Sequence, residues 1–180
     1  MTITSRFCQQ ALKLGPPVSR AVRVQRDLRV PMPDGAVLLA DDLEVIGEVT
    51  VELFVRSSRE HTDFFARLCD VAESGASINI CDALPRLAPV QPPAEPDAEP
   101  GAEPGAAIRI SFPLWPTAHR FRRGHRLRLQ VSSGAHPRYS RNPGTGAPLA
   151  TATALLTADQ QIYHDSDRPS AVILPTAAPG

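Results

Sequence analysis

The stretch "EVTVELFVRSSREHTDFFARLCDV" at residues 48–71 contains the pattern that decides the fold class. From Val49 to Val55 every second residue is valine or leucine, with Thr, Glu and Phe between them. A period of two is typical of a β-strand with one face on the core. The polar residues 59–63 indicate a turn, and residues 64–71 resume as a second strand. The stretch therefore predicts strands joined by a short connection.

Alternating apolar residues recur on both sides of this stretch. They predict further strands at residues 20–30, 37–40, 78–81, 108–115, 126–131, 150–156 and 171–174. The "PDG" turn at 33–35 makes a hairpin of the first two, because Pro fixes φ and Gly accepts a positive φ. Proline supplies 19 of 180 residues, which disfavours a helical bundle. We expect an all-β module of about eight strands with little helix.

Two segments differ in composition from the rest. Residues 88–107 contain "AEPDAEPGAEPG", three Ala-Glu-Pro units with four acids and no base. Such a segment buries too little apolar surface to offset its ordering entropy, so we expect a disordered insertion between two strands rather than an acidic ligand. Residues 1–19 read as a flexible leader that contains Gly15-Pro16-Pro17.

The charge balance excludes some partners. Lys+Arg and Asp+Glu both number 19, which gives no argument for an anionic partner. Seven arginines lie in residues 119–141, but those of "RLRLQV" alternate with core residues and should face solvent. Phe121 and Tyr139 are too few for a stacking platform, so we predict no nucleic-acid partner. We expect the arginines at 120, 122 and 123 to pair with Glu48, Glu52 or the acidic insertion.

The cysteines indicate the cellular compartment. Cys8, Cys69 and Cys81 are an odd number without metal-ligand spacing. Cys69 and Cys81 lie in apolar runs, so we expect buried free thiols and a reducing, cytoplasmic setting. No run approaches the ~18 apolar residues of a membrane span, so no membrane association is predicted.

No catalytic constellation emerges. The chain has no G-x-S-x-G elbow, and Ser132-Ser133-Gly134 near His136 is the nearest imitation. His119 and His125 are six residues apart, match no compact metal motif and have no acid nearby in sequence. The remaining histidines, His61 and His164, are isolated. We predict no catalytic residue, no metal and no cofactor.

Asp63 and Asp70 allow two interpretations. On one extended run they would fall on opposite faces. The first is a calcium or sugar ligand at a loop end. The second, which we favour, is a turn cap and a solvated strand end.

Four segments together resemble a known family. They are "LEVIGEVTVELFVRSSREHTDFFARLCDV" (43–71), "SINICDALPRL" (77–87), "LWPTAHRFRRGHRLRLQVSSGAHPRYSRNPGTG" (114–146) and "HDSDRPSAVILP" (164–175). In this order they resemble the C-terminal domain of the X-prolyl dipeptidyl-peptidase and cocaine-esterase (CocE/NonD) family. The resemblance implies a jelly-roll sandwich of the galactose-binding-like type. It also implies a non-catalytic domain that packs on an α/β-hydrolase domain, which supplies the catalytic Ser, Asp and His.

The N-terminal part resembles another piece of the same family. "VRVQRDLRVPMPDGAVLLAD" at 22–41 is similar to the hairpin that opens the hydrolase domain. Here Asp41-Asp42 leads straight into the jelly roll, so the resemblance implies that the catalytic machinery and the usual first jelly-roll strand are missing between them. We expect a leader (1–19), a hairpin remnant (20–42) and a jelly roll (43–180). The hairpin either pairs with the jelly-roll edge, hangs loose or pairs with another copy.

Three functions follow from these observations. The first is a non-catalytic β-sandwich with a structural or interaction role, whose exposed face binds a hydrolase domain or a second copy. The second is the residual serine-hydrolase activity, dipeptidyl-peptidase or acyl esterase, that the family resemblance suggests. The third is a carbohydrate-binding module that uses Trp115, Tyr139 and Tyr163.

Overall fold

The computed structural model describes residues 24–31, 36–39, 41–88 and 107–177. Within these ranges the chain forms thirteen strands and no helix, which confirms the all-β prediction. The strands are β1 (Val24–Pro31), β2 (Ala36–Leu38), β3 (Leu43–Gly47), β4 (Thr50–Ser57), β5 (Thr62–Asp63), β6 (Phe65–Val71), β7 (Ser77–Ala83), β8 (Arg86–Leu87), β9 (Ile108–Pro113), β10 (Thr117–Phe121), β11 (Arg126–Ser132), β12 (Gln160–Tyr163) and β13 (Ala171–Ala177). The described part holds no helix that is long and apolar enough to cross a membrane.

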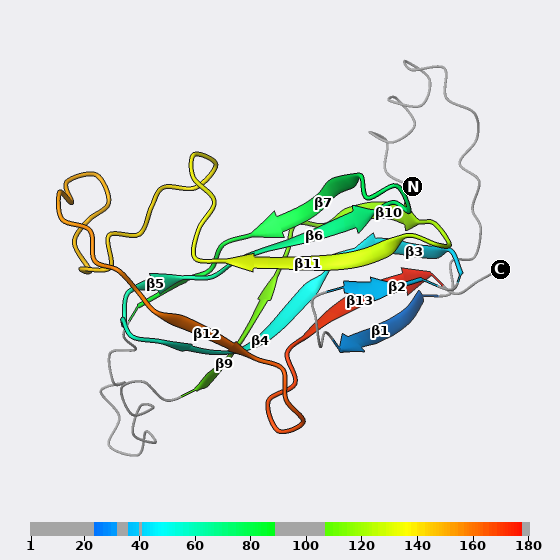
Figure 1. The fold of residues 1–180 in the computed structure, drawn as a ribbon, viewed down its shortest axis with the longest axis horizontal. Helices are drawn as coiled ribbons and strands as arrows, with labels where there is room; N and C mark the ends of the chain where they lie inside the picture. The colour runs from blue at the N-terminus through cyan, green and yellow to red at the C-terminus, as the bar shows by residue number, and fades with distance from the viewer. Residues whose placement is uncertain (1–23, 32–35, 40, 89–106, 178–180) are drawn as a thin grey trace, which may run out of the picture.

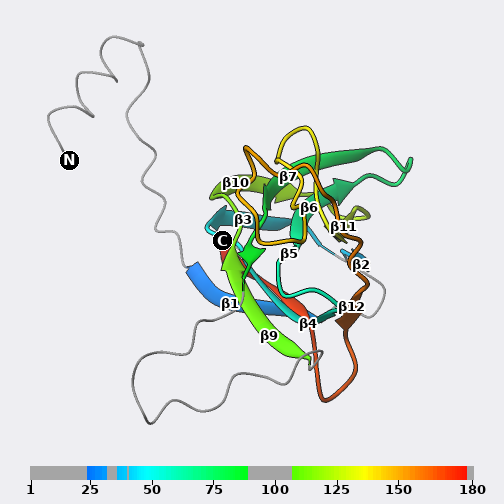
Figure 2. The same cartoon turned by 90° about the vertical axis from the view of Figure 1, so that its left-hand side faces the viewer.

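The strands form two main antiparallel sheets. The first follows the order β10-β3-β13-β4-β12, with β1 added on β13 and β9 on β4. The second follows the order β2-β11-β6-β7, and β5 pairs with β8 separately. Figures 1 and 2 show β6, β7 and β11 in a layer above β4, β13 and β1. The architecture is therefore a β-sandwich.

The core fills the space between these layers. Val49, Val51, Leu53 and Val55 are at most 2% exposed, so the predicted core face is confirmed, whereas Glu52 on the opposite face is also buried, at 7%. Across the core, the second sheet contributes Leu68, Leu127 and Leu129. β6 and β7 form an antiparallel hairpin, whose turn is closed by the Ala72 N–H donating to the Ala76 carbonyl.

The first two strands differ from the predicted hairpin. β1 pairs with β13, with Val30 opposite Val172, and β2 pairs with β11, with Val37 opposite Leu127. Each strand thus joins a different sheet instead of pairing with the other. A two-stranded hairpin is marginal in water, whereas an edge of a packed sheet satisfies each strand's backbone groups on a stable template. Residues 20–23 and 32–35 lie outside the described ranges.

The region before β13 also differs from the prediction. Residues 150–156 form no strand. The N–H groups of Thr151 and Ala152 donate to the Pro148 carbonyl, and that of Leu156 donates to the Pro143 carbonyl, all within the connection between β11 and β12. The strand lies further along, at β12. Strand β10, which follows Pro116, was not predicted from the sequence. Most of the predicted insertion at 88–107 lies outside the described ranges.

Candidate functional site

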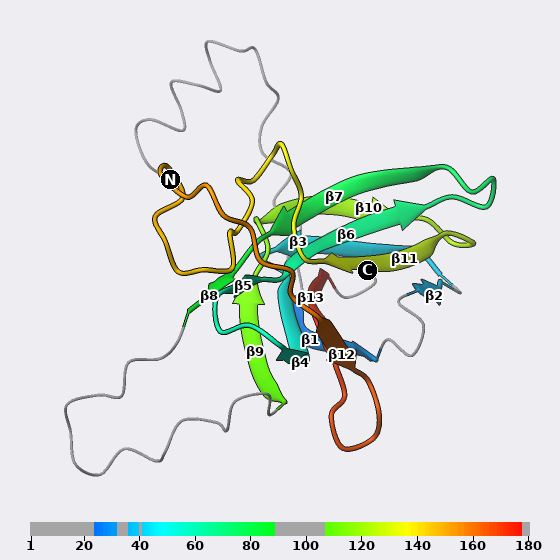
Figure 3. The same ribbon diagram turned by 60° about the vertical axis from the view of Figure 1, so that its left-hand side comes forward.

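A long connection joins β11 to β12 and forms one wall of a cavity. Residues 133–159, called the end loop below, contain no strand and extend from one end of the sandwich beside β5 and β8 (Figure 3). The cavity beneath the end loop has a volume of about 440 Å³. Gly146 has a φ of +76°, and a Cβ there would lie 2.5 Å from His61 Nε2, so the loop packs closely on this histidine.

Asp63 fastens the middle of the end loop. Its side chain is 1% exposed and accepts hydrogen bonds from Arg86 Nε at 2.9 Å and Nη2 at 2.8 Å. Asn142 of the end loop donates to the same carboxylate at 2.7 Å, and Arg86 also donates to the Ser140 carbonyl at 3.0 Å. The hydrogen bond with Asp63 raises the pKa of Arg86. The ion pair between the buried Asp63 and the partly exposed Arg86 therefore ties the loop to the β5–β8 pair.

Asp82 of β7 fastens the start of the end loop. It is 6% exposed and accepts hydrogen bonds from Arg138 Nε at 3.1 Å, the Tyr139 hydroxyl at 3.2 Å and Arg67 at 3.3 Å. The pKa of Arg138 is raised, first by its hydrogen bond with Tyr139 and then by the charge of Asp82. The Tyr139 ring packs on Phe65 with centroids 5.9 Å apart. Neither anchor has a local signal in the amino-acid sequence.

Asp70 connects the two sheets at another position. It lies opposite Leu127 on the inner face of the second sheet and is 4% exposed. Its Oδ2 lies 2.9 Å from His119 Nε2, and its Oδ1 lies 2.7 Å from His125 Nδ1. The prediction that Asp70 is a solvated strand end is therefore wrong. The prediction that Asp63 caps a turn did not include its ion pair with Arg86. The acid that His119 and His125 lack nearby in the sequence is therefore Asp70 of β6.

Comparison with known proteins decides the family. The family model described as the X-Pro dipeptidyl-peptidase C-terminal non-catalytic domain matches residues 37–173. The chain belongs to this family. The family resemblance inferred from the sequence is thereby confirmed, and the non-catalytic domain occupies most of these 180 residues.

Relatives of this non-catalytic domain are parts of much longer hydrolases. The cocaine esterase of Rhodococcus sp. (strain MB1 Bresler) is 35% identical over 140 residues, which are 77% of this chain and 24% of the esterase. The structure of an α-amino acid ester hydrolase superposes with a TM-score of 0.64 at 25% identity, covering 84% of this chain and 27% of that one. An aminopeptidase from a marine sediment Thaumarchaeota archaeon has the same TM-score at 22% identity, with coverages of 84% and 28%. The chain thus spans about a quarter of the length of these relatives.

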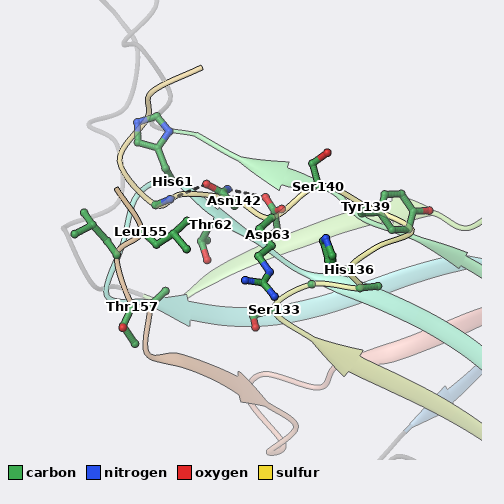
Figure 4. Close-up of a pocket in the computed structure, with 16 residues that line it drawn as sticks. His61, Thr62, Asp63, Ser133, His136, Tyr139, Ser140, Asn142, Leu155 and Thr157 are labelled. Atoms are coloured by element: carbon green, nitrogen blue, oxygen red, sulfur yellow. Dashed lines mark hydrogen bonds between the residues drawn. The ribbon is translucent and has the colours of Figure 1, made fainter. Parts of the chain in front are cut away.

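The serine, histidine and aspartate side chains considered for hydrolysis lie near one another but do not form a catalytic triad. Ser133, His61, His136 and Asp63 all line the cavity, and Figure 4 shows their placement. The Asp63 carboxylate is bonded to Arg86 and Asn142, however. No hydrogen bond joins Ser133 to a histidine in the described ranges, and Ser132 donates to the Gly134 carbonyl. In the described residues these side chains are therefore not joined in the serine–histidine–acid chain of hydrogen bonds that a serine nucleophile requires.

Metal ligands do not converge in the described ranges. No group of three or more His, Cys, Asp or Glu side chains there is arranged to hold a metal ion. The partners of Asp63 are hydrogen-bond donors, which occupy the oxygens that a calcium ion would need.

The basic cluster is distributed over solvent-facing positions, and its partners differ from those expected. Arg126 and Arg128 are exposed while Leu127 and Leu129 are buried, as predicted. Arg120 pairs with Asp42, and Glu52 pairs with Arg109 at 2.6 Å. The acidic insertion, the other partner expected for the arginines, lies outside the described residues. The Arg123 backbone N–H and the Arg120 guanidinium lower the pKa of Asp42.

The aromatic residues proposed for sugar binding have different surroundings. Trp115 is 66% exposed beyond the end of β9. Tyr139 packs on Phe65, and the guanidinium of Arg168 covers Tyr163 at 3.7 Å from the ring centroid. Nothing in these contacts gathers the three rings into one platform.

Proposed function

We propose that this domain acts without catalysis, by docking on an α/β-hydrolase domain through the end loop. One observation carries the proposal: the loop is fastened by two buried carboxylates yet presents three leucines to solvent. Leu149, Leu155 and Leu156 are 44%, 64% and 43% exposed. Exposed apolar side chains that gather on one segment mark an interaction surface.

The anchoring of the loop favours binding in energetic terms. A loop without strands loses conformational entropy when it is immobilised by a partner. Here the bonds to Asp63 and Asp82 already hold residues 138–142. The ordering cost at binding is therefore small, and more of the interaction energy appears as affinity. The family membership and the fourfold greater length of the relatives support a hydrolase domain as the partner.

The test is a binding titration against the Rhodococcus cocaine esterase with the segment that matches this chain removed. Calorimetry should give a 1:1 complex with a dissociation constant of about 10 μM or tighter. The double variant Leu155→Glu, Leu156→Glu should weaken binding at least tenfold, because it places two charges in an apolar contact.

The control is Ile78→Glu, which changes an equally exposed side chain on β7, 55% exposed. It should bind as the unchanged chain does. Equal weakening by both variants would contradict a docking surface on the end loop. A chain that forms its own dimer through Leu155 and Leu156, and ignores the esterase fragment, would replace the proposal with self-association.

Residual hydrolase activity is tested by covalent labelling. We expect a fluorophosphonate probe to leave the folded chain unlabelled, because Ser133 has no hydrogen-bonded histidine to accept its proton. Mass spectrometry of the intact protein measures the adduct directly. A stoichiometric adduct that disappears in Ser133→Ala would establish an active nucleophile.

The two described cysteines support a reducing, cytoplasmic setting as part of this proposal. Cys69 and Cys81 are free and buried. Burial, and then the charge of Asp82, raises the pKa of Cys81 to about 11. Only the thiolate reacts, so at pH 8 Cys81 should react with a disulfide reagent roughly 100-fold more slowly in the folded than in the unfolded chain.

The thiol prediction is measured by release of the chromophore from Ellman's reagent. A Cys8→Ser, Cys69→Ser background isolates the Cys81 signal. Equal rates of reaction in buffer and in concentrated urea would show that the Cys81 thiol is accessible in the folded chain. That result would contradict its burial.

A further inference from the structure

The cavity under the end loop has an unbalanced set of charges. Arg141, His61 and His136 line it, and among the described residues Asp63 is its only lining acid. The charge of Asp63 is already neutralised by Arg86, whose guanidinium binds both carboxylate oxygens. Within the described part of the chain, Arg141 makes no ion pair. The cavity therefore offers a guanidinium without a carboxylate partner.

The same cavity has an apolar wall. Leu155 and Leu156 line it while remaining largely exposed to solvent. Figure 4 shows Leu155 and Thr157 on one side and His136 and Tyr139 on the other. The polar residues Ser133, Ser140 and Thr157 also belong to the lining. Binding sites for small molecules combine such apolar surface with a few polar groups.

We infer that this cavity binds a carboxylate that carries a short apolar group. Arg141 is the ionic anchor, because a guanidinium binds a carboxylate through two parallel hydrogen bonds. The leucines cover the apolar group, and the volume of about 440 Å³ admits a ligand of this size. The carboxylate belongs either to a free acid or to the C-terminus of a peptide. This inference goes beyond the proposed docking and does not depend on it.

The test is a ¹H–¹⁵N titration of the chain alone with N-acetyl-L-leucine. Shifts should map to the end loop, with a dissociation constant on the order of 1 mM, as expected for a dozen heavy atoms. N-acetyl-L-leucinamide has the same shape without the charge and should bind at least tenfold more weakly. Gly-Gly-Leu and its C-terminal amide distinguish the two sources of the carboxylate. If Gly-Gly-Leu binds and its amide does not, the cavity accepts the C-terminus of a peptide. If N-acetyl-L-leucine binds and Gly-Gly-Leu does not, the cavity accepts free acids only.

Arg141→Gln should abolish the difference between the acid and the amide. Its fold should persist, because Arg141 is exposed and the spectrum without ligand reports folding directly. Arg128→Gln removes an equally exposed arginine from β11 and should bind as the unchanged chain does. Equal affinity for the acid and the amide, unchanged binding by Arg141→Gln, or no shifts at about 20 mM ligand would overturn the inference.

Discussion

Replacing Asp63 by alanine is expected to lower the free energy of unfolding by about 3 kcal/mol and to release the end loop. The substitution removes the acceptor of two bonds from Arg86 and one from Asn142. It leaves the Arg86 guanidinium, 34% exposed, beside a pocket with no counter-charge. The estimate is at the lower end for a broken buried pair because water reaches the arginine. Urea unfolding followed by tryptophan fluorescence measures the change.

The matched control for Asp63 is Asp165→Ala, which breaks the exposed pair with Arg168 at 2.8 Å. Asp165→Ala should lower the stability far less than Asp63→Ala does, since both members of this pair are solvated. Asp63→Asn should fall between the two, because an amide oxygen still accepts one bond but carries no charge. An Asp63→Ala variant as stable as Asp165→Ala would contradict the anchoring described here.

Asp70→Ala is expected to be as destabilising, at about 3 kcal/mol. Asp70 connects His119 of the first sheet to His125 near the start of β11. Without it, two partly buried ring nitrogens lose their acceptor inside the sandwich. Asp70→Asn should recover part of the loss, because its amide can accept from one imidazole and donate to the other once that ring changes tautomer.

Side-chain ¹⁵N spectra of the two imidazoles separate this explanation from simple cavity formation. In Asp70→Asn at least one ring should change tautomer relative to the unchanged chain. Equal stability of Asp70→Ala and the unchanged chain would show that the contact between the sheets contributes nothing. An Asp70→Asn variant no better than Asp70→Ala would show that the charge, not the hydrogen bonding, is required.

The sheet strands could be predicted because their signal is local. The alternation from Val49 to Val55 and in residues 126–131 corresponds to burial on one face, which depends only on the period of a strand. The same reasoning failed at residues 150–156. There Leu155 and Leu156 are apolar but exposed, and backbone hydrogen bonds of this segment run to Pro148 and Pro143 of the end loop instead of to a neighbouring strand.

The anchors of the end loop could not be predicted because their partners are distant in sequence. Asn142 lies 79 residues from Asp63, and His119 lies 49 residues from Asp70. A single sequence shows that an acid and a donor are present. It does not show that they are in contact, because that contact depends on the order of strands in two sheets. The pairing of β1 with β13 is similar: the strand was visible in the pattern, and its partner was not.

The most direct test of a docking role is hydrogen exchange of the chain with and without the esterase fragment. On addition of the esterase fragment we expect slower amide exchange within residues 133–159. Exchange at the tip of the β6–β7 hairpin, which includes Gly75, should not change. Protection of the hairpin tip with an unaffected end loop would contradict the proposed surface. No protection anywhere, at fragment concentrations well above the expected dissociation constant, would contradict docking itself.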